Sequence, residues 1–326
     1  MTTRRIMTAL LIGGGLLAYR AEGAERLYDK LKWDVGIRDV YLRGLKQPDV
    51  WKAAKTIGVT RLEVVVDENL TCPGLFEGDA KPYRIDTPAN RKKLMQALAD
   101  HGASISCFCA VIRGKDAPSQ KHVDWITRVT EAAGEMEVPV IMMPLGYGDK
   151  TDEAYVAKSV AFFKKLVPVA RRTGVVLTYE NLGRYLNRRE IALPILEGLP
   201  RDCCGIANDI TNMYWYGHPI DTIYELAKAV APYVRYVHVK SIKYPAAKKN
   251  TQRKPGWEYG KYAEPVRTGD IDFHRIIAIY AAAGFKGDLT IEDDSLRKFD
   301  AAGKTKVLID DVKLLREVIK EVEASR

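Results

Sequence analysis

Short apolar stretches alternate along the chain with longer segments in which apolar residues recur every three or four positions. The short stretches are β-branched or almost continuously apolar, and each follows a glycine, a proline or a polar turn, as strands do. Eight of them occur, at 32–37, 61–66, 103–111, 138–143, 175–180, 204–209, 234–240 and 288–293. Near-continuous apolar strands are typical of a parallel sheet that is covered on both faces.

The longer segments carry signals for the ends of helices. Thr87, followed directly by a proline, predicts a helix start, because its hydroxyl can cap the helix and proline suits the first helical position. Asn187 and Glu190 have the spacing of a capping box. Pro168 lies inside the helical pattern of 153–173, where we expect it to kink the helix or to mark its end.

Eight strand–helix units follow one another with no linker-like break. The simplest architecture for this α/β pattern is a single (β/α)8 TIM barrel over residues 25–326, and an open doubly wound sheet is the alternative. A chain of 326 residues with 47% hydrophobic and 29% charged residues is globular and long enough for such a barrel. Five cysteines exclude a disulfide scaffold.

Residues 1–24 have the pattern of a signal peptide. Arg4 and Arg5 precede an apolar run at 6–19, and small residues follow it. This pattern resembles a twin-arginine signal and predicts a periplasmic or exported protein; if the segment is instead a structured N-terminus, a cytoplasmic location is expected. The run is shorter than the roughly 20 residues of a membrane-spanning helix, so we expect no membrane insertion after signal removal.

Residues 241–269 show neither a helix nor a strand pattern, and stretches of this length are often lids or binding loops. Trp257 and three tyrosines lie there among basic residues, a composition that suits sugar faces and anionic groups. A solvated surface loop or a contact between copies in a homo-oligomer is the alternative. Nucleic acid is not an expected partner, because no recognised nucleic-acid motif accompanies these residues, and the net charge of +9 does not decide the partner.

Polar residues end four successive predicted strands. Glu180, Asp209, His238 and Glu292 occupy these positions. Because α/β enzymes place their chemistry at the carboxyl ends of strands, we expect the four side chains to converge. Three carboxylates in one confined site repel one another unless a cation lies between them. This oxygen-rich set with one imidazole predicts one divalent ion, Mn²⁺ first and Mg²⁺, Co²⁺, Zn²⁺ or Fe²⁺ as alternatives.

The segments around these strand ends resemble the xylose-isomerase-like TIM barrel superfamily, which is often described as sugar phosphate isomerase/epimerase. They are VLTYEN at 176–181, GIANDITN at 205–212, VHVKS at 237–241 and TGDIDFHRIIAIYAAAGFKGDLTIED at 268–293. The resemblance implies that Glu180, Asp209, His238 and Glu292 are metal ligands. It also implies that Glu180 and Glu292 are the catalytic pair on opposite sides of the substrate carbon, and it matches Glu63 to a family acid of variable role.

The chain departs from this family pattern at three positions near the site. Ser241 stands where an aspartate often follows the His-Val-Lys, Asn212 where sugar epimerases carry a histidine, and Tyr244 where they carry an arginine. These changes concern the substrate more than the metal. Lys240 shares a strand face with His238, so it either stabilises an enolate or pairs with a ligand acid. The residues we predict to bind substrate are Glu63, Asn212, Lys240 and Trp257.

The resulting functional prediction is a metal-dependent sugar or keto-sugar isomerase or epimerase that removes a proton beside a carbonyl and forms a metal-bound enediolate. The alternative is a lyase or dehydratase that acts on a keto-sugar or a 3-keto-glycoside through the same enolate. A non-catalytic sugar-binding barrel is a third possibility. All three predict a small carbohydrate as the partner.

Overall fold

The structure is a computed structural model that describes residues 26–112, 114 and 116–325. The predicted signal peptide, residues 1–24, therefore lies outside the described residues. Within the described part, no helix combines the length and apolar character needed to cross a bilayer.

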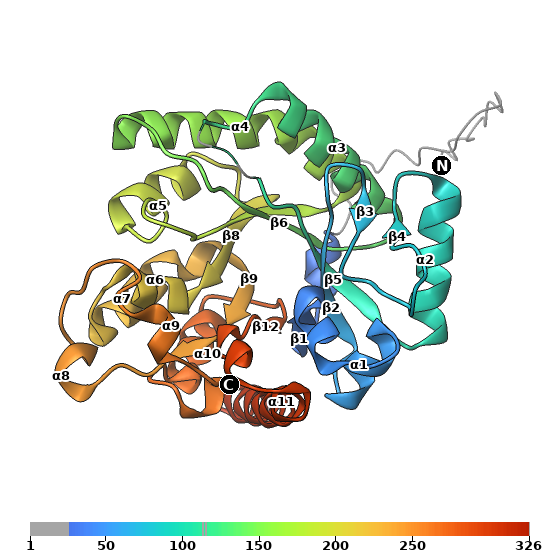
Figure 1. The fold of residues 1–326 in the computed structure, drawn as a ribbon. Coiled ribbons are helices and arrows are strands. Elements are labelled where there is room, and N and C mark those ends of the chain that lie inside the picture. The colour runs from blue at the N-terminus through green and yellow to red at the C-terminus, as the bar shows by residue number, and fades with distance from the viewer. Residues whose placement is uncertain (1–25, 113, 115, 326) are drawn as a thin grey trace, which may run out of the picture.

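Eight parallel strands of the described chain close into a barrel, which confirms the predicted (β/α)8 TIM barrel (Figure 1). In barrel order they are β1 (Val35–Arg38), β2 (Arg61–Val65), β5 (Ser104–Cys109), β6 (Val140–Pro144), β7 (Val176–Glu180), β8 (Cys204–Asp209), β9 (Val234–Val239) and β12 (Leu289–Ile291). The ends differ from the predicted ones by at most three residues. The open sheet is wrong, because Val35 of β1 pairs with Leu289 of β12 and closes the ring.

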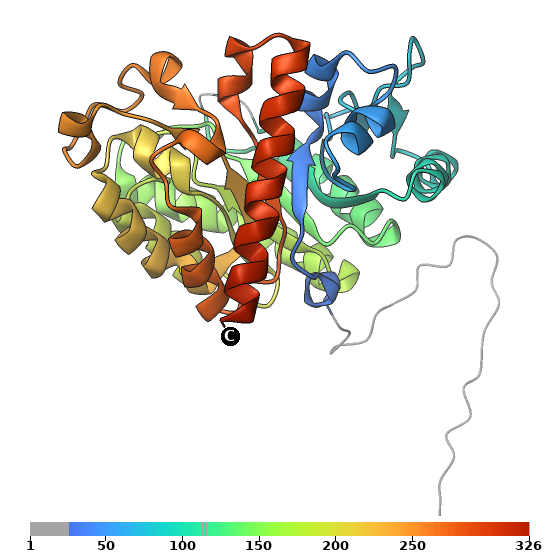
Figure 2. The ribbon, with the colours of Figure 1, turned by 90° about the horizontal axis from the view of Figure 1, so that it is seen from below.

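Helices cover the outside of the barrel. They are α1 (Val50–Thr56), α2 (Pro88–Asp100), α3 (Gln120–Glu135), α4 (Asp152–Thr173), α5 (Arg189–Glu197), α6 (Ile210–Tyr216), α7 (Ile220–Val230), α10 (Phe273–Ala282) and α11 (Ala301–Ala324). Figure 2 shows α11, in dark red, running along the barrel wall beside β1. Short 3-10 turns and a two-stranded hairpin complete the outer layer: η1 (Leu27–Lys30), η2 (Asp39–Leu45), η3 (Ala231–Tyr233), η5 (Asp294–Lys298), β3 (Thr71–Cys72) and β4 (Tyr83–Arg84).

The helix-end predictions have mixed outcomes. The hydroxyl of Thr87 accepts a hydrogen bond from the amide of Asn90 at 3.2 Å and so caps α2 as predicted. Pro168 lies within α4, which continues to Thr173, so the proline does not end the helix. The predicted capping box is wrong, because the buried side chain of Asn187 accepts a hydrogen bond from Asn181 and donates one to a backbone carbonyl.

The segment 241–269 is built of short elements, so the prediction that it lacks helix and strand is wrong. It contains β10 (Ser241–Ile242), α8 (Ala246–Lys249), α9 (Tyr259–Tyr262), β11 (Ala263–Glu264) and η4 (Val266–Thr268), and β10 pairs antiparallel with β11. Elements of two to four residues are too short to produce a hydrophobic period that a sequence could reveal.

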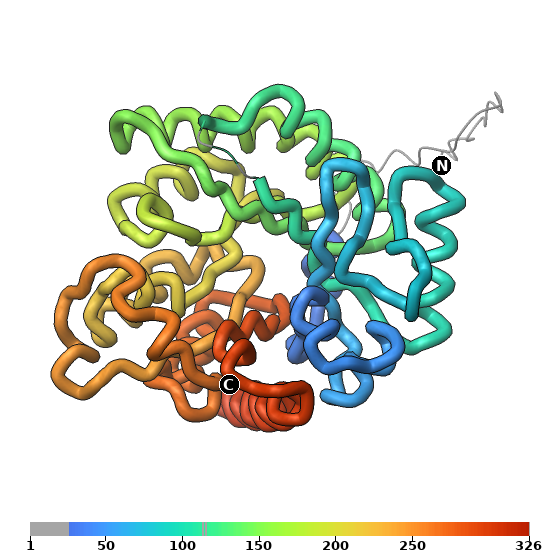
Figure 3. Tube along the Cα trace, viewed as in Figure 1, coloured from blue at the N-terminus to red at the C-terminus, as the bar shows by residue number. Residues whose placement is uncertain are grey.

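Long-range hydrogen bonds hold this segment, which belongs to the orange part of the tube in Figure 3, against the barrel helices. The buried guanidinium of Arg253 donates to the carbonyls of Tyr214 (3.2 Å) and His218 (2.8 Å), on and just after α6. The carboxylate of Asp311 on α11 accepts hydrogen bonds from the amides of Val266 and Arg267 at 3.3 and 3.1 Å. The segment is thus fastened at both its middle and its end.

Candidate metal centre

The carboxyl ends of four neighbouring strands bring the predicted ligands together. Glu180 and Asp209 are the last residues of β7 and β8, His238 lies one residue before the end of β9, and Glu292 follows β12 directly. Pairing in register sets Asp209 beside His238 and His238 beside Thr290. The four side chains are buried, and one donor atom from each lies within 4.8 Å of the donor atoms of the others. The described residues therefore contain a set of donors that could hold one metal ion.

The imidazole of His238 is held on both sides by carboxylates. Its Nε2 lies 2.6 Å from Oε2 of Glu63, and its Nδ1 lies 3.4 Å from Oε1 of Glu180 and 3.3 Å from Oε2 of Glu292. Burial lowers the pKa of His238, but the surrounding carboxylates, Glu63 first, outweigh burial and raise that pKa well above its usual value. Nδ1 is thus the nitrogen that faces the other donors, and Glu63 holds the opposite nitrogen.

Two cations pair with Glu292. The guanidinium of Arg38 contacts its Oε1, and the ammonium of Lys240 lies 2.9 Å from its Oε2. Lys240 also lies 2.7 Å from Oδ2 of Asp209, and Nε of Arg38 lies 3.2 Å from Oε1 of Glu63. Burial favours the neutral form of Glu292, but Lys240, His238 and Arg38 overcome burial and hold the pKa of that carboxyl well below its usual range.

Asp209 combines a structural and a site role. Its Oδ1 accepts hydrogen bonds from the amides of Thr211 and Asn212 at 2.9 and 3.1 Å and so caps α6. Its Oδ2 is left for Lys240. Burial raises the pKa of Asp209 to about 6, although Lys240 acts in the opposite direction. The cap fixes the carboxylate, because the helix cannot shift without losing both hydrogen bonds.

The predicted substrate-binding residues divide between the site and its surroundings. Asn212 donates from Nδ2 to Oε1 of Glu180 at 3.1 Å, and Glu63 and Lys240 contact the candidate ligands as described above. Trp257 is different: its ring contacts are with Tyr244 and Tyr262, at centroid distances of 5.6 and 5.5 Å, inside its own segment. Direct contact with a substrate remains a prediction for each of the four.

Four residues that contact the site network were not among the predicted site residues. Arg38 lies at the end of β1, one residue beyond the predicted strand, where the strand-end rule would have found it. Asp294 lies 3.9 Å from Lys240 and accepts hydrogen bonds from the hydroxyls of Tyr41 (3.0 Å) and Tyr259 (2.5 Å). Tyr259, rather than Trp257, is therefore the aromatic residue by which segment 241–269 reaches the site network.

The donor set fits a divalent cation. Oδ2 of Asp209 and Oε2 of Glu292 already converge on a positively charged group, the ammonium of Lys240. Carboxylate oxygens and one imidazole nitrogen suit several divalent ions, and a carboxylate behind a ligating histidine is the usual arrangement in such sites. The residues that would hold the ion are Glu180, Asp209, His238 and Glu292.

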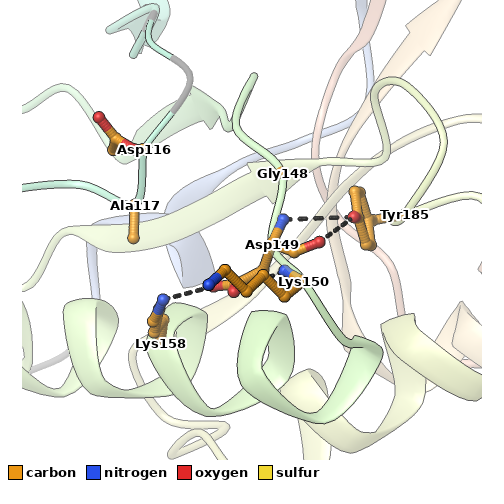
Figure 4. Close-up of a pocket in the computed structure, with 7 residues that line it drawn as sticks. All are labelled: Asp116, Ala117, Gly148, Asp149, Lys150, Lys158 and Tyr185. Carbon is orange, nitrogen blue, oxygen red and sulfur yellow. Dashed lines mark hydrogen bonds and ion pairs between the residues drawn. The ribbon is translucent and has the colours of Figure 1, made fainter.

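A hollow between the loops that follow β5, β6 and β7 contains none of these residues (Figure 4). Its lining consists of Asp116, Ala117, Gly148, Asp149, Lys150, Lys158 and Tyr185. The ammonium of Lys158 lies 2.6 Å from the carboxylate of Asp149, and the hydroxyl of Tyr185 donates to the carbonyl of Asp149. The polar groups at the centre of this hollow thus pair with one another.

Comparison with known proteins agrees with the barrel fold. Residues 51–318 match the family model described as "Xylose isomerase-like TIM barrel". The chain belongs to the xylose isomerase-like TIM barrel family. A search among curated proteins found no match.

Three solved structures illustrate the shared fold. A xylose isomerase domain protein from Planctomyces limnophilus has a TM-score of 0.64 at 18% identity, over 90% of this chain and 99% of that one. The IolI protein, crystallised with a zinc atom, has a TM-score of 0.64 at 15% identity, over 89% of this chain and 99% of that one. The 3-keto-D-glucoside 4-epimerase from E. coli has a TM-score of 0.57 at 17% identity, over 86% of this chain and 98% of that one. At such identities the likeness concerns the fold alone.

Proposed function

We propose that the protein is a divalent-metal-dependent isomerase or epimerase of a sugar or keto-sugar. The observation that carries this proposal is the placement of Glu180 and Glu292 on Nδ1 of His238, at 3.4 and 3.3 Å, with Asp209 completing the set. Epimerisation beside a carbonyl needs one group that removes the proton and one that returns a proton on the other face, and two carboxylates beside one cation-binding centre can serve both steps. The 3-keto-D-glucoside 4-epimerase from E. coli shares the fold and supports a carbohydrate as the substrate class.

Glu180, Asp209, His238 and Glu292 would hold the ion. A bound divalent ion polarises a carbonyl and acidifies the neighbouring C–H. Mn²⁺ is our first choice, because three of the four donors are carboxylates, which suit Mn²⁺, with Mg²⁺, Co²⁺, Zn²⁺ and Fe²⁺ as alternatives.

The two glutamates differ in what their oxygens contact, which assigns them different roles. Oε1 of Glu180 is held by Asn212, whereas its Oε2 has no hydrogen-bond or ion-pair partner in the described part of the chain. Both oxygens of Glu292 are paired with cations. We therefore assign the first proton abstraction to Oε2 of Glu180.

We assign the chemistry on the opposite face of the substrate carbon to Glu292 and Lys240. The ammonium of Lys240 donates hydrogen bonds to an oxyanion as it develops and so stabilises the enediolate. Glu292 is held as a carboxylate by its cations, so for epimerisation the proton that it passes to the other face of the carbon would come from the ammonium of Lys240, 2.9 Å away, and solvent would restore the proton of Lys240. Asn212 and His238 keep the carboxylate of Glu180 in a single orientation.

A lyase or dehydratase is the second candidate, and the same asymmetry favours it. Elimination from a keto-sugar needs one base on the carbon beside the carbonyl and a leaving group on the next carbon. Glu180 supplies the base. Elimination requires no proton to be returned to that carbon, so Glu292 can stay paired with its two cations throughout. The shared enolate explains why one site suits both outcomes.

Proton NMR in D₂O tests the proposal. Protein loaded with each of the five ions is incubated with a panel of free sugars and 3-keto sugars, with metal-stripped protein as the control. Deuterium uptake at one carbon with an intact skeleton supports an isomerase or epimerase, and an unsaturated or cleaved product supports the lyase. If no loaded form exchanges a C–H proton or forms a product above the control, the enzymatic proposal fails.

A further inference from the structure

Arg38 joins two carboxylates of the site that come from different strands. Its Nε lies 3.2 Å from Oε1 of Glu63 on β2, and its Nη1 contacts Oε1 of Glu292 after β12. The side chain is 14% exposed. Glu63 holds Nε2 of His238, and Glu292 is a candidate ligand. The guanidinium therefore touches one ligand directly and a second ligand through one intervening residue.

With His238 neutral, as a metal ligand must be, four carboxylates and two cationic side chains carry a net charge of −2, which one divalent ion balances. Glu63, Glu180, Asp209 and Glu292 supply the negative charges, and Arg38 and Lys240 supply the positive ones. A guanidinium keeps its charge at every pH at which the protein is folded. Salt screens such a buried charge weakly, so the charge of Arg38 acts on any ion held by the ligands.

We propose that Arg38 is a positioning residue that sets the charge of the metal site and thereby its preference for divalent over trivalent ions. The inference rests on the metal-binding part of the proposed function and goes beyond it, because it concerns a residue outside the predicted ligand set. Without Arg38, one negative charge of the site loses its counter-charge. The Coulomb attraction then grows in proportion to the charge of the bound ion, so a trivalent ion gains more than a divalent one.

The experiment compares the dissociation constants of Mn²⁺ and Tb³⁺, measured near neutral pH by competition with chelators and by sensitised Tb³⁺ luminescence. Two neutral variants are used, Arg38→Met and Arg38→Gln, the second of which keeps hydrogen-bond donors. Arg38→Lys keeps the charge. Arg61→Met is the matched control, because Arg61 lies at the start of β2 and pairs with Asp288 at 3.9 Å, at the other end of the barrel.

In both neutral variants, the ratio of the two dissociation constants is expected to shift toward Tb³⁺ by about tenfold or more relative to wild type. Arg38→Lys and Arg61→Met should stay within about threefold of wild type. A purely structural loss would weaken both ions alike and leave the ratio unchanged. Circular dichroism identifies any variant that does not fold, and the other neutral variant then decides.

The outcomes separate this inference from the proposed function. If wild type binds Mn²⁺ and the neutral variants keep the wild-type ratio, the role of Arg38 is overturned and the metal site stands. If wild type binds none of the five divalent ions and no Tb³⁺, both the metal site and the role of Arg38 are overturned.

Discussion

Oε2 of Glu63 lies 2.6 Å from Nε2 of His238, on the side of the imidazole opposite to the nitrogen that faces Glu180 and Glu292. Both side chains are fully buried, so the pair holds the ring in one orientation. A carboxylate in this position fixes the tautomer of a ligating histidine and increases its basicity. We therefore interpret Glu63 as the partner of a ligand, in addition to its predicted role in substrate binding.

The first prediction concerns this pair. Glu63→Leu should weaken binding of the preferred divalent ion by about 10- to 100-fold, the usual effect of losing such a partner. Glu63→Gln should lose less metal affinity, because its amide oxygen can still accept a hydrogen bond from Nε2 of His238. Chelator competition measures both, and His238→Ala, which removes the ligand itself, gives the lower limit of affinity. Wild-type affinity in Glu63→Leu would show that Glu63 does not act through His238.

The second prediction separates the two glutamates. Glutamine keeps the size of the side chain and one ligand oxygen but cannot take up a proton as a carboxylate does. At saturating metal, Glu180→Gln should lose solvent exchange of the substrate proton by about 10²- to 10⁴-fold. Glu292→Gln should retain exchange while failing to epimerise. NMR in D₂O measures both rates. If both variants react within about threefold of wild type, the carboxylates are ligands only.

The third prediction compares two aromatic residues of segment 241–269. Tyr259→Phe removes the hydrogen bond to Asp294, which lies 3.9 Å from Lys240. We expect the rate of proton–deuterium exchange in the most reactive sugar of the panel to fall several-fold, with the affinity for the metal ion unchanged. Trp257→Phe should affect exchange less, because Trp257 packs against Tyr244 and Tyr262. An equal loss in both variants would point to a general loosening of the segment, which thermal unfolding would also detect.

The fourth prediction is a pH dependence of stability caused by Asp311. Burial raises the pKa of this carboxyl to about 7, with Asp293 adding to the effect, while the amides of Val266 and Arg267 oppose it. The folded state therefore holds a proton that the unfolded state releases near pH 4, and stability falls as pH rises from about 4 to about 7.

Asp311→Asn cannot ionise, so its free energy of unfolding relative to wild type should rise over that same interval and level off above it. Each unit of pKa difference corresponds to about 1.4 kcal/mol. Urea unfolding at several pH values measures the effect. Asp310→Asn is the control, because that exposed carboxylate pairs with Lys306 on the surface. Parallel curves for Asp311→Asn and wild type would contradict the assignment.

The fifth prediction concerns export. Arg4, Arg5 and the apolar run that follows motivate a twin-arginine signal. Mass spectrometry of periplasmic material from the native cell should find a mature N-terminus near residue 24. Full-length protein that is confined to the cytoplasm would refute the prediction.

The barrel and the four candidate ligands were predictable from the sequence because both depend on local pattern. Apolar runs of strand length identify parallel strands, and the carboxyl ends of parallel strands meet at one end of a barrel. Glu180, Asp209, His238 and Glu292 are found by that rule alone. The capping box at Asn187 failed because its buried side chain hydrogen-bonds Asn181 and the carbonyl of Gly183 within the loop between β7 and α5. The spacing of two residues does not show that the loop folds back on itself.

The pairing of charges in the site depends on tertiary structure. Arg38 and Glu292 lie 254 positions apart in the chain and meet only because β12 closes the ring against β1. In the same way, folding of segment 241–269 through contacts with α6 and α11 decides that Tyr259 reaches Asp294 while Trp257 packs within the segment. Periodicity determines which residues lie at a strand end, because it is a property of neighbouring residues. The closure of the barrel determines which side chains contact one another. A buried charge is costly unless it is paired, so each charged side chain of the site pairs with an opposite charge that closure brings close from another strand.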